Sequence, residues 1–209
     1  MKTSPFNQFA AEYDRWFDTH KFAYRSEVEA VRKFIPLERN GIEVGAGTGR
    51  FSIPFNIKTG VEPSKEMAAI ARSRGLAIQN STAENLPFPN EQFDFALFVT
   101  TLCFVDNPSL ALQEAHRILK LPGKIIIGII DRESSLGKKY ESMKNKNKFY
   151  SCAKFYSTKD VMELLEQTHF KQIKTCQTIF SNPDEMKEKD EVKEGFGEGA
   201  FVVLSAIKQ

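Results

Sequence analysis

The chain has 209 residues, 29 basic and 27 acidic side chains, and a formal net charge of +2. This length suffices for one well-buried domain, and the balanced charge gives no global field that would select nucleic acid or an anionic membrane. Residues 1–17 mix charges into their apolar positions, so they lack a signal-peptide core, and the longest apolar run, 125–130, is too short to cross a bilayer. Three cysteines, odd in number and widely separated, are typical of reduced thiols rather than of a metal site. We therefore expect one cytoplasmic domain with no membrane segment and no metal.

Residues 1–35 have the apolar spacing of helices. Large apolar side chains recur every three or four residues, which predicts one buried helical face. Packing against the body of the protein is the simplest role for this face. The residues that form it are Phe6, Phe9, Ala10, Tyr13, Trp16 and Phe17.

Residues 41–50 are predicted to be a buried strand that runs into a glycine-rich turn. Gly45, Gly47 and Gly49 stand at every second position, where they allow a sharp turn and leave no Cβ between the backbone and a bound ligand. A dinucleotide fingerprint requires Gly-x-Gly-x-x-Gly, and here Arg50 occupies the position of its third glycine. An acid at Glu43 would repel a pyrophosphate but suits a ligand with a cationic centre. A tight turn without any ligand is the alternative interpretation.

The connection from this turn to the next strand, 57–62, is unusually short. Only residues 50–56 separate the two, and Pro54 interrupts them. A parallel crossover normally takes about a dozen residues including its helix. We therefore expect a stub helix or plain turn here, with Phe51, Ile53 and Phe55 or the N-terminal helices covering that face of the sheet.

Glu62 ends the second predicted strand. A carboxylate at this position faces the crevice beside the first strand, where it can accept both hydroxyl hydrogens of a ribose. The alternative is an exposed acid that favours the N-terminus of the following helix, which Ser64 caps. A third strand is predicted at 75–80 and a fourth, apolar on both faces as an interior parallel strand requires, at 92–100.

The second half of the chain continues the alternation of helices and strands. Asn107 caps a helix that stops before Pro122, and a fifth strand is expected at 125–131. Residues 132–157 combine six lysines with five aromatic side chains, which suits either nucleic-acid binding or a segment that closes over a site. A helix at 157–168 and two alternating segments, 170–180 and 199–207, complete the pattern, with an exposed loop at 181–198.

Four motifs in this order resemble those of the class I S-adenosylmethionine-dependent methyltransferases. Glu43-x-Gly45-x-Gly47-x-Gly49 resembles motif I, and Glu62 stands where motif II has its acid. Residues 81–88 are similar to the "AE.LPF" loop of the family, and residues 114–124 to its "E..RVLKPGG" segment, with Leu121 and Lys124 as departures. Residues 13–17 look like the "YD.w" segment of a helix that covers the cofactor. The resemblance spans about residues 41–180.

This resemblance implies an α/β fold that is Rossmann-like and doubly wound, with a mostly parallel seven-stranded sheet and an antiparallel C-terminal strand. We expect a single methyltransferase domain, 1–209. It would comprise a helical cover (1–38), a cofactor-binding core (39–131), a lid insertion (132–157) and a C-terminal helix with antiparallel strands (158–209).

The resemblance also implies a site and a reaction. The cofactor would be S-adenosyl-L-methionine, and the enzyme would transfer its methyl group to a small molecule by direct in-line displacement. Such a reaction needs alignment and dehydration more than acid–base groups, so no catalytic residue is assigned. We expect acceptor contacts from Tyr13, Thr101 and Phe104. The expected cofactor contacts are Glu43, Gly45, Ala46, Gly47, Gly49, Glu62, Pro63, Thr82, Ala83, Glu84, Leu86 and Thr100.

Other functions remain open. The lysines of 132–157 would suit an RNA-directed methyltransferase, although neither an Asp/Asn-Pro-Pro-Tyr nor a Pro-Cys motif follows the fourth strand. A non-catalytic cofactor-binding module is a second alternative. An NAD-dependent oxidoreductase is disfavoured by the early third glycine. The oligomeric state is not indicated by the sequence.

Overall fold

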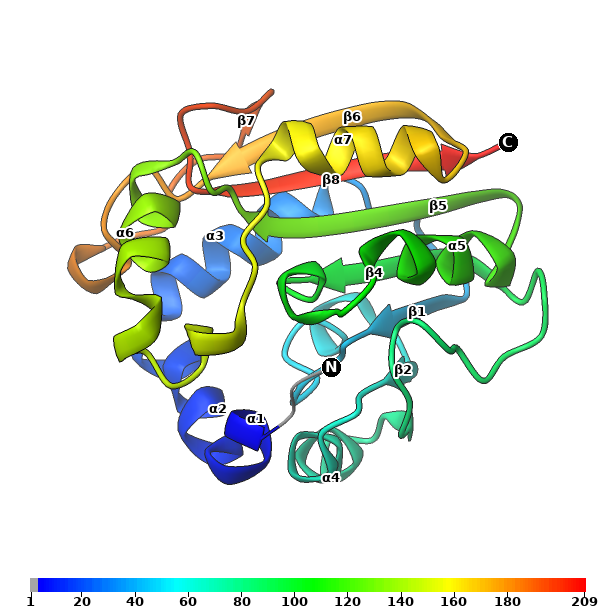
Figure 1. The fold of residues 1–209 in the computed structure, drawn as a ribbon, viewed down its shortest axis with the longest axis horizontal. Helices are drawn as coiled ribbons and strands as arrows, with labels where there is room; N and C mark the ends of the chain where they lie inside the picture. Colours follow the sequence, from blue (N-terminus) through cyan, green and yellow to red (C-terminus); the bar gives the residue numbers. More distant parts are fainter. Residues whose placement is uncertain (1–3) are drawn as a thin grey trace.

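The computed structural model describes residues 4–209, which form one eight-stranded sheet in the order β3-β2-β1-β4-β5-β8-β6-β7 (Figure 1). The first five strands are parallel, and β8 is antiparallel to both β5 and β6. The predicted Rossmann-like fold is confirmed. An eighth strand arises because β7 pairs with Cys176 and Gln177 from within the expected loop 181–198. The strands are β1 (Gly41–Val44), β2 (Thr59–Val61), β3 (Ala77–Gln79), β4 (Phe93–Val99), β5 (Leu119–Ile130), β6 (Phe170–Thr178), β7 (Lys193–Glu194) and β8 (Phe201–Lys208).

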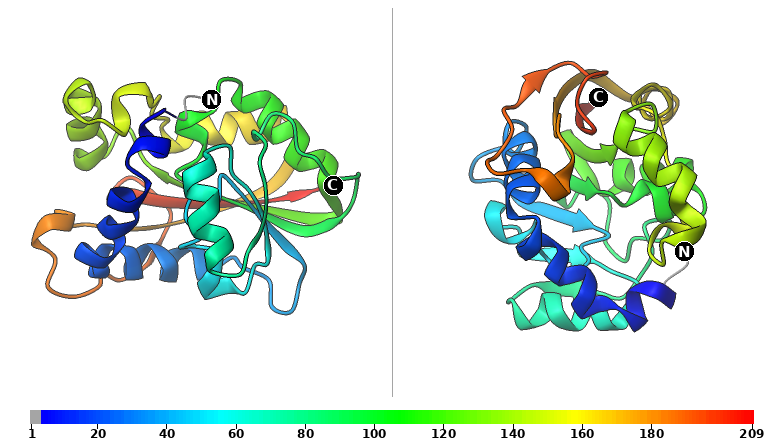
Figure 2. Two further views of the ribbon diagram at one scale, coloured as in Figure 1. Left: turned by 90° about the horizontal axis from the view of Figure 1, so that it is seen from below. Right: turned by 90° about the vertical axis from the view of Figure 1, so that its left-hand side faces the viewer.

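Helices cover both faces of the sheet. In Figure 2, α5 and α7 lie on one side of the strands and α3 on the other. No helix within residues 4–209 is long and apolar enough to cross a membrane. The helices are α1 (Ser4–Gln8), α2 (Ala10–Thr19), α3 (Lys21–Arg32), α4 (Lys65–Ser73), α5 (Pro108–Ile118), α6 (Ser135–Met143) and α7 (Thr158–Gln167).

Strand β4 shows how the two layers are joined. Ala96 and Phe98 belong to the core beneath α5 and α7, whereas Phe95, Leu97 and Val99 belong to the core beneath α3. Because successive side chains of a strand point to opposite faces, an interior strand must be apolar on both. This confirms the interior position predicted for residues 92–100.

The short crossover is a single 3₁₀ turn, Ile53–Phe55, as predicted. Phe51 is buried, but Ile53 is half exposed and covers little of the sheet. The N-terminal helices fill the space instead, since the ring of Phe51 lies 6.0 Å from that of Phe17 and 5.6 Å from that of Tyr24. The predicted helical region therefore does reach the sheet, and it forms the three helices α1, α2 and α3.

Two covering segments meet at the end of the sheet where β1, β4 and β5 terminate. Figure 1 shows α1, α2 and α6 gathered beyond the arrowheads of these strands. The segment after α6 contacts the N-terminal helices directly: Lys148 Nζ lies 2.6 Å from Glu12 Oε2, and the Phe149 and Tyr13 rings are 5.5 Å apart. Residues far apart in the sequence thus enclose the carboxyl ends of the parallel strands.

Candidate functional site

The turn that follows β1 contains three glycines in the left-handed conformation, at alternate positions. The φ angles are +72° at Gly45, +54° at Gly47 and +84° at Gly49. The N–H groups of Gly45 and Ala46 donate to the carbonyl of Val61 at 2.8 and 2.9 Å, which ties the turn to the end of β2. A Cβ on Gly45 would lie 2.5 Å from the Thr101 side chain, whereas one on Gly47 would meet only Met67, at 4.0 Å. The turn is therefore crowded beneath Gly45 and open at Gly47.

Thr101 supports this turn from below. Its side chain is buried, and its hydroxyl donates to the carbonyl of Val44 at 3.0 Å. Since the hydroxyl is committed to β1, Thr101 joins the ends of β1 and β4. The structure does not bring it to the cavity described below.

Glu62 lies directly beside the turn, as the sequence suggested. Its two oxygens accept the N–H groups of Gly47 at 2.9 Å and Ser64 at 2.8 Å. Burial raises the pKa of this carboxyl to about 6, against the effect of the two hydrogen bonds. A carboxylate offers about four lone-pair positions, so two remain for further donors. Pro63 follows at the half-buried entry to α4.

Glu43 is buried in β1 and has a partner within the chain. Its carboxylate accepts the hydroxyl hydrogen of Ser52, which lies in the short crossover. Burial raises the pKa of Glu43 to about 8; the hydrogen bond from Ser52 opposes this rise and the charge of Glu62 adds to it. This hydrogen bond joins the end of β1, just before the glycine turn, to the short crossover.

The loop after β3 contributes Thr82, Ala83, Glu84 and Leu86. Oε1 of Glu84 accepts the N–H of Asp106 at 2.8 Å. Oε2 of Glu84 is buried and has no hydrogen-bond partner within the described part of the chain. Ala83 and Leu86 are buried in the core beneath α5. Glu84 is therefore the member of this loop with a free acceptor.

Asp14 attaches α2 to the glycine turn, a contact that the sequence motifs did not indicate. One of its oxygens accepts from Thr48 Oγ1 at 2.6 Å, and the carboxylate also pairs with Arg50 at 2.8 Å and Arg74 at 2.7 Å. Burial would raise the pKa of Asp14, but the hydrogen bonds from Arg74, Arg50 and Thr48 outweigh this and hold the pKa well below its usual range. The N-terminal cover is thus fastened to the turn itself.

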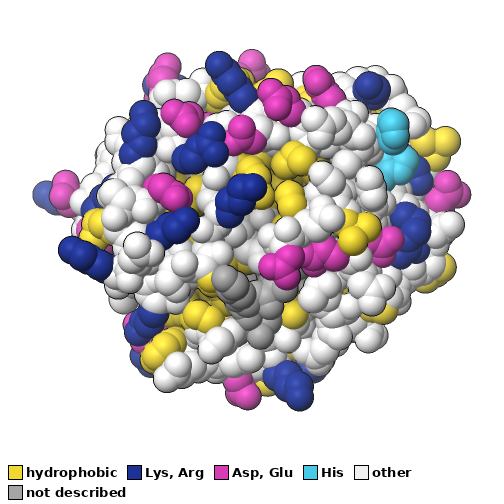
Figure 3. Space-filling view, in the orientation of Figure 1, with side chains coloured by type: hydrophobic (Ala, Val, Ile, Leu, Met, Phe, Trp, Pro, Cys, Tyr) yellow, Lys and Arg dark blue, Asp and Glu magenta, His cyan; other side chains and the backbone are white. Residues whose placement is uncertain are grey.

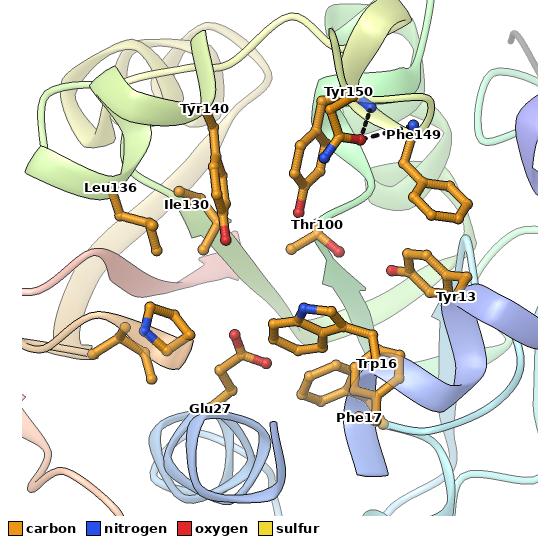
Figure 4. Close-up of a pocket in the computed structure, with 14 residues that line it drawn as sticks. Tyr13, Trp16, Phe17, Glu27, Thr100, Ile130, Leu136, Tyr140, Phe149 and Tyr150 are labelled. Carbon is orange, nitrogen blue, oxygen red and sulfur yellow. Dashed lines mark hydrogen bonds between the residues drawn. The ribbon is translucent and has the colours of Figure 1, made fainter. Parts of the chain in front are cut away.

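A cavity of about 140 Å³ lies at Thr100, after the end of β4, and half of its lining residues are aromatic (Figure 4). Its walls come from α2, α3, the crossover residue Phe51, the ends of β4 and β5, the segment 135–152 and residues 179–183. The lining residues are Tyr13, Trp16, Phe17, Glu27, Phe51, Thr100, Ile130, Leu136, Tyr140, Asn147, Phe149, Tyr150, Ile179 and Pro183.

Tyr13 lies close to both parts of the site. Burial raises the pKa of its hydroxyl above the usual value, the side chain of Thr100 opposes this by hydrogen bonding, and the charges of Glu27 and Glu62 both add to the rise. Glu62 lies beside the turn, and Glu27 lines the cavity. Tyr13 and Thr100 therefore mark where the two parts meet.

The predicted acceptor residues are only partly brought together. Tyr13 lines the cavity, as does Thr100, which was expected at the cofactor. Phe104 instead packs edge-on against Phe6, with ring centroids 4.9 Å apart. Glu27 was missed, although a signal existed: with Ala23 and Ala30 it forms an i, i+4, i+7 row, so an acid stands on the buried face of α3.

The surface over this region does not present one sign of charge. In Figure 3, Lys and Arg side chains alternate with Asp and Glu over the same face. Two lysines of the expected lid are engaged with acids, Lys144 with Glu141 at 3.0 Å and Lys148 with Glu12 at 2.6 Å. The lysines do not form a continuous basic track on this face.

Known proteins resemble the chain along its whole length. A methyltransferase-domain family profile matches residues 42–127. An uncharacterized protein of Methanocaldococcus jannaschii is 54% identical over 97% of this chain and 98% of its own length. A crystal structure from Thermotoga maritima, described as a SAM-dependent methyltransferase and "possible histamine N-methyltransferase", is 53% identical, with a TM-score of 0.97 over the full length of both chains.

A more distant relative matches part of the chain. The demethylmenaquinone methyltransferase of Tropheryma whipplei is 32% identical over 133 residues, which is 58% of this chain and 56% of its own length. The similarity to the M. jannaschii and T. maritima proteins extends over both the glycine turn and the residues that line the cavity.

Proposed function

Because this chain belongs to the class I S-adenosylmethionine-dependent methyltransferase family, we propose that it transfers a methyl group from that cofactor to a small molecule held in the aromatic cavity. The observation that carries the proposal is the position of the cavity. The cavity begins at Thr100. The next residue is Thr101, and the Thr101 side chain packs beneath Gly45 of the turn. An acceptor in the cavity would therefore lie next to the cofactor.

The residues around the turn fit S-adenosylmethionine. Glu62 retains two acceptor positions for the ribose hydroxyls, and the buried Oε2 of Glu84 is a free acceptor for the exocyclic amine of adenine. Gly47 leaves the backbone open to a ligand. When bound, the cofactor supplies a methyl group on a sulfonium centre. Through Ser52, Glu43 would keep the turn in place, and Asp14 would hold the cover over it.

The size and lining of the cavity support a small acceptor. An apolar cavity of about 150 Å³ holds benzene, so this one suits roughly six to ten non-hydrogen atoms. The aromatic walls exclude water, which protects a reactive methyl donor and strengthens electrostatic interactions inside. An RNA acceptor has less support, since the lysines on the face that Figure 3 shows alternate with acids. The description of the T. maritima structure adds histamine to the candidates for screening.

A thermal-unfolding screen followed by a transfer assay tests this function. S-adenosylhomocysteine should raise the Tm of the purified protein, because it binds only the folded state, and NADH should not. Methyl-labelled cofactor should then label members of a library of small molecules, histamine included. Stabilisation by NADH alone, or transfer to RNA and to no small molecule, would contradict the proposal.

A further inference from the structure

Glu27 is the one charged residue among the 14 that line the cavity, and within residues 4–209 nothing pairs with it. It projects from α3 and is 7% exposed. No lysine, arginine or histidine stands among the lining residues given above. Figure 4 shows its carboxylate pointing into the space below Tyr140, Tyr150 and Thr100.

An ionised carboxylate in such a place is unfavourable without a partner. Buried charges in proteins are normally paired or hydrogen-bonded, and an unpaired one shifts its pKa and becomes neutral. Burial raises the pKa of Glu27 to about 8. The charge of Glu27 contributes to raising the pKa of four tyrosines, Tyr13, Tyr24, Tyr140 and Tyr150, and none of these supplies a positive charge.

We propose that the methyl acceptor carries a cationic amine, and that this amine pairs with Glu27 inside a cage formed by Trp16, Tyr140 and Tyr150. The proposal rests on the function proposed above, because it takes the cavity to be the acceptor site. Aromatic faces attract cations, most strongly where water is excluded, and a carboxylate completes the recognition. A neutral or anionic acceptor would leave Glu27 buried without a partner.

The cage is built from two separate parts of the chain. The Trp16 ring is stacked on His20 at 4.5 Å, which fixes it on α2. Tyr140 and Tyr150, 4.8 Å apart, come from the segment 135–152. The cation would therefore contact both the N-terminal helices and the segment expected to act as a lid.

The test is a comparison of shape-matched probes. Trp16 is the single tryptophan of the chain, so its fluorescence reports ligand binding in the cavity. The wild-type protein, with and without saturating S-adenosylhomocysteine, is titrated with 2-phenylethylamine and with neutral 2-phenylethanol, then with hexylamine and hexanol. In at least one pair we expect the amine to bind ten-fold or more tighter than the alcohol.

Two variants assign this preference to Glu27. In Glu27→Gln the ratio of amine to alcohol affinity should fall below about three-fold, while the affinity for S-adenosylhomocysteine is unchanged. Glu29→Gln removes an exposed carboxylate from the same helix and should leave the ratio unchanged. Amine binding to the wild type at pH 7 should also release close to one proton as Glu27 ionises, measured by calorimetry in buffers of different ionisation enthalpy.

Two results would overturn the proposal: equal affinity for amine and alcohol in both pairs, or no amine binding by a folded protein. These outcomes leave the proposed function standing if S-adenosylhomocysteine still binds. Failure of S-adenosylhomocysteine to bind would instead remove the proposed function, and the titrations without it would still decide the charge preference. The wild-type comparison alone suffices if Glu27→Gln does not fold.

Discussion

The cofactor turn and the aromatic cavity adjoin at Thr100 but are built in opposite ways. The turn consists of backbone from one stretch of chain, where Glu62 accepts the N–H of Gly47 and Thr101 donates to the carbonyl of Val44. The cavity consists of side chains from distant segments: the N-terminal helices, Phe51, the ends of β4 and β5, residues 135–152 and residues 179–183. Most N–H groups of the turn have a partner, whereas the Glu27 carboxylate in the cavity has none within the described residues.

This difference separates a site that a short sequence motif can describe from one that depends on tertiary packing. A turn that relies on glycine and backbone hydrogen bonds can be written in a short motif. A cavity of side chains depends on how remote helices pack, so it can change its ligand without changing the motif. We expect mutations in the turn to reduce stability together with cofactor affinity, and mutations in the cavity to alter the ligand alone.

The largest effect is expected for Gly45→Ala. The new Cβ would meet Thr101 at 2.5 Å on a backbone with a φ of +72°. Left-handed strain and overpacking together should cost about 3 kcal/mol of unfolding free energy. Gly75→Ala is the matched control, since φ is +88° there but the Cβ meets nothing within 4 Å. Denaturant unfolding should show about 1 kcal/mol for the control; equal losses would mean that Thr101 does not confine the turn.

Glu27→Gln should make the ligand-free protein more stable than the wild type at pH 8.5, where the wild type has to bury an ionised carboxylate. The folded-state pKa of Glu27 is raised from 4.5 to about 8, so the fold binds this proton more tightly than the unfolded chain does. The stability linked to that proton is complete below pH 4.5 and is lost as the pH rises towards 8. Glu43 keeps a similar dependence in both proteins.

Urea unfolding at several pH values measures this effect. The stability of the variant should fall less steeply between pH 5 and 8 than that of the wild type, by up to about 1.4 kcal/mol per pH unit. Glu29→Gln should follow the wild type. Parallel curves for all three proteins would show that Glu27 is not held in an apolar environment.

Asp14→Asn should cost about 1 kcal/mol, because a charge-assisted contact to two arginines becomes a neutral one. Asp18→Asn is a close comparison: Asp18 also pairs with Arg50 at 2.8 Å, but its side chain is 64% exposed against 15% for Asp14. Exposed pairs contribute little, so the Asp18 variant should lose less than about 0.5 kcal/mol. Thermal unfolding distinguishes the two, and a larger loss for Asp18 would contradict the assigned attachment of the cover.

The smallest effect on stability is expected for Lys148→Met. Its exposed ion pair with Glu12 should contribute less than about 0.5 kcal/mol to global stability. The pair nevertheless joins the two covering segments, so its loss should speed amide exchange in residues 135–152 about three-fold. In the wild type, exchange in this segment should slow only when S-adenosylhomocysteine and an amine are both bound. An amide-exchange rate in this segment that is unchanged by both ligands would argue against a lid.

The features that could be predicted from the sequence follow the same division between turn and cavity. The positions of Gly45 and Glu62 relative to the first two strands could be predicted, because a turn and a strand end are local features. The short crossover was likewise predicted from residues 50–56. The count of strands was not, since β7 pairs through two residues of a charged loop that carries no alternating pattern.

The residues that line the cavity were harder to predict from the sequence, for a physical reason. Tyr13 was expected at the acceptor side, and the aromatics of 132–157 were expected to line a pocket. Thr101 was also expected there but is not among the residues that line the cavity, because a position in the sequence does not determine which way a side chain points at a strand end. Glu27 and Asp14 acquire their roles only through helix packing. An acid on an apolar helix face was the available signal.

The most direct test of the account is calorimetric titration of S-adenosylhomocysteine into the wild type, Glu62→Ala and Glu27→Gln. Removing the Glu62 carboxylate should weaken binding by about 2 kcal/mol, or about thirty-fold, since it deprives buried donors of their acceptor. Glu66→Ala, at an exposed acid in the first turn of α4, is the control and should bind as the wild type does. Glu27→Gln should also bind within about three-fold of the wild type. Unchanged affinity in Glu62→Ala, or a thirty-fold loss in Glu27→Gln, would contradict the division of the site into a cofactor turn and an acceptor cavity.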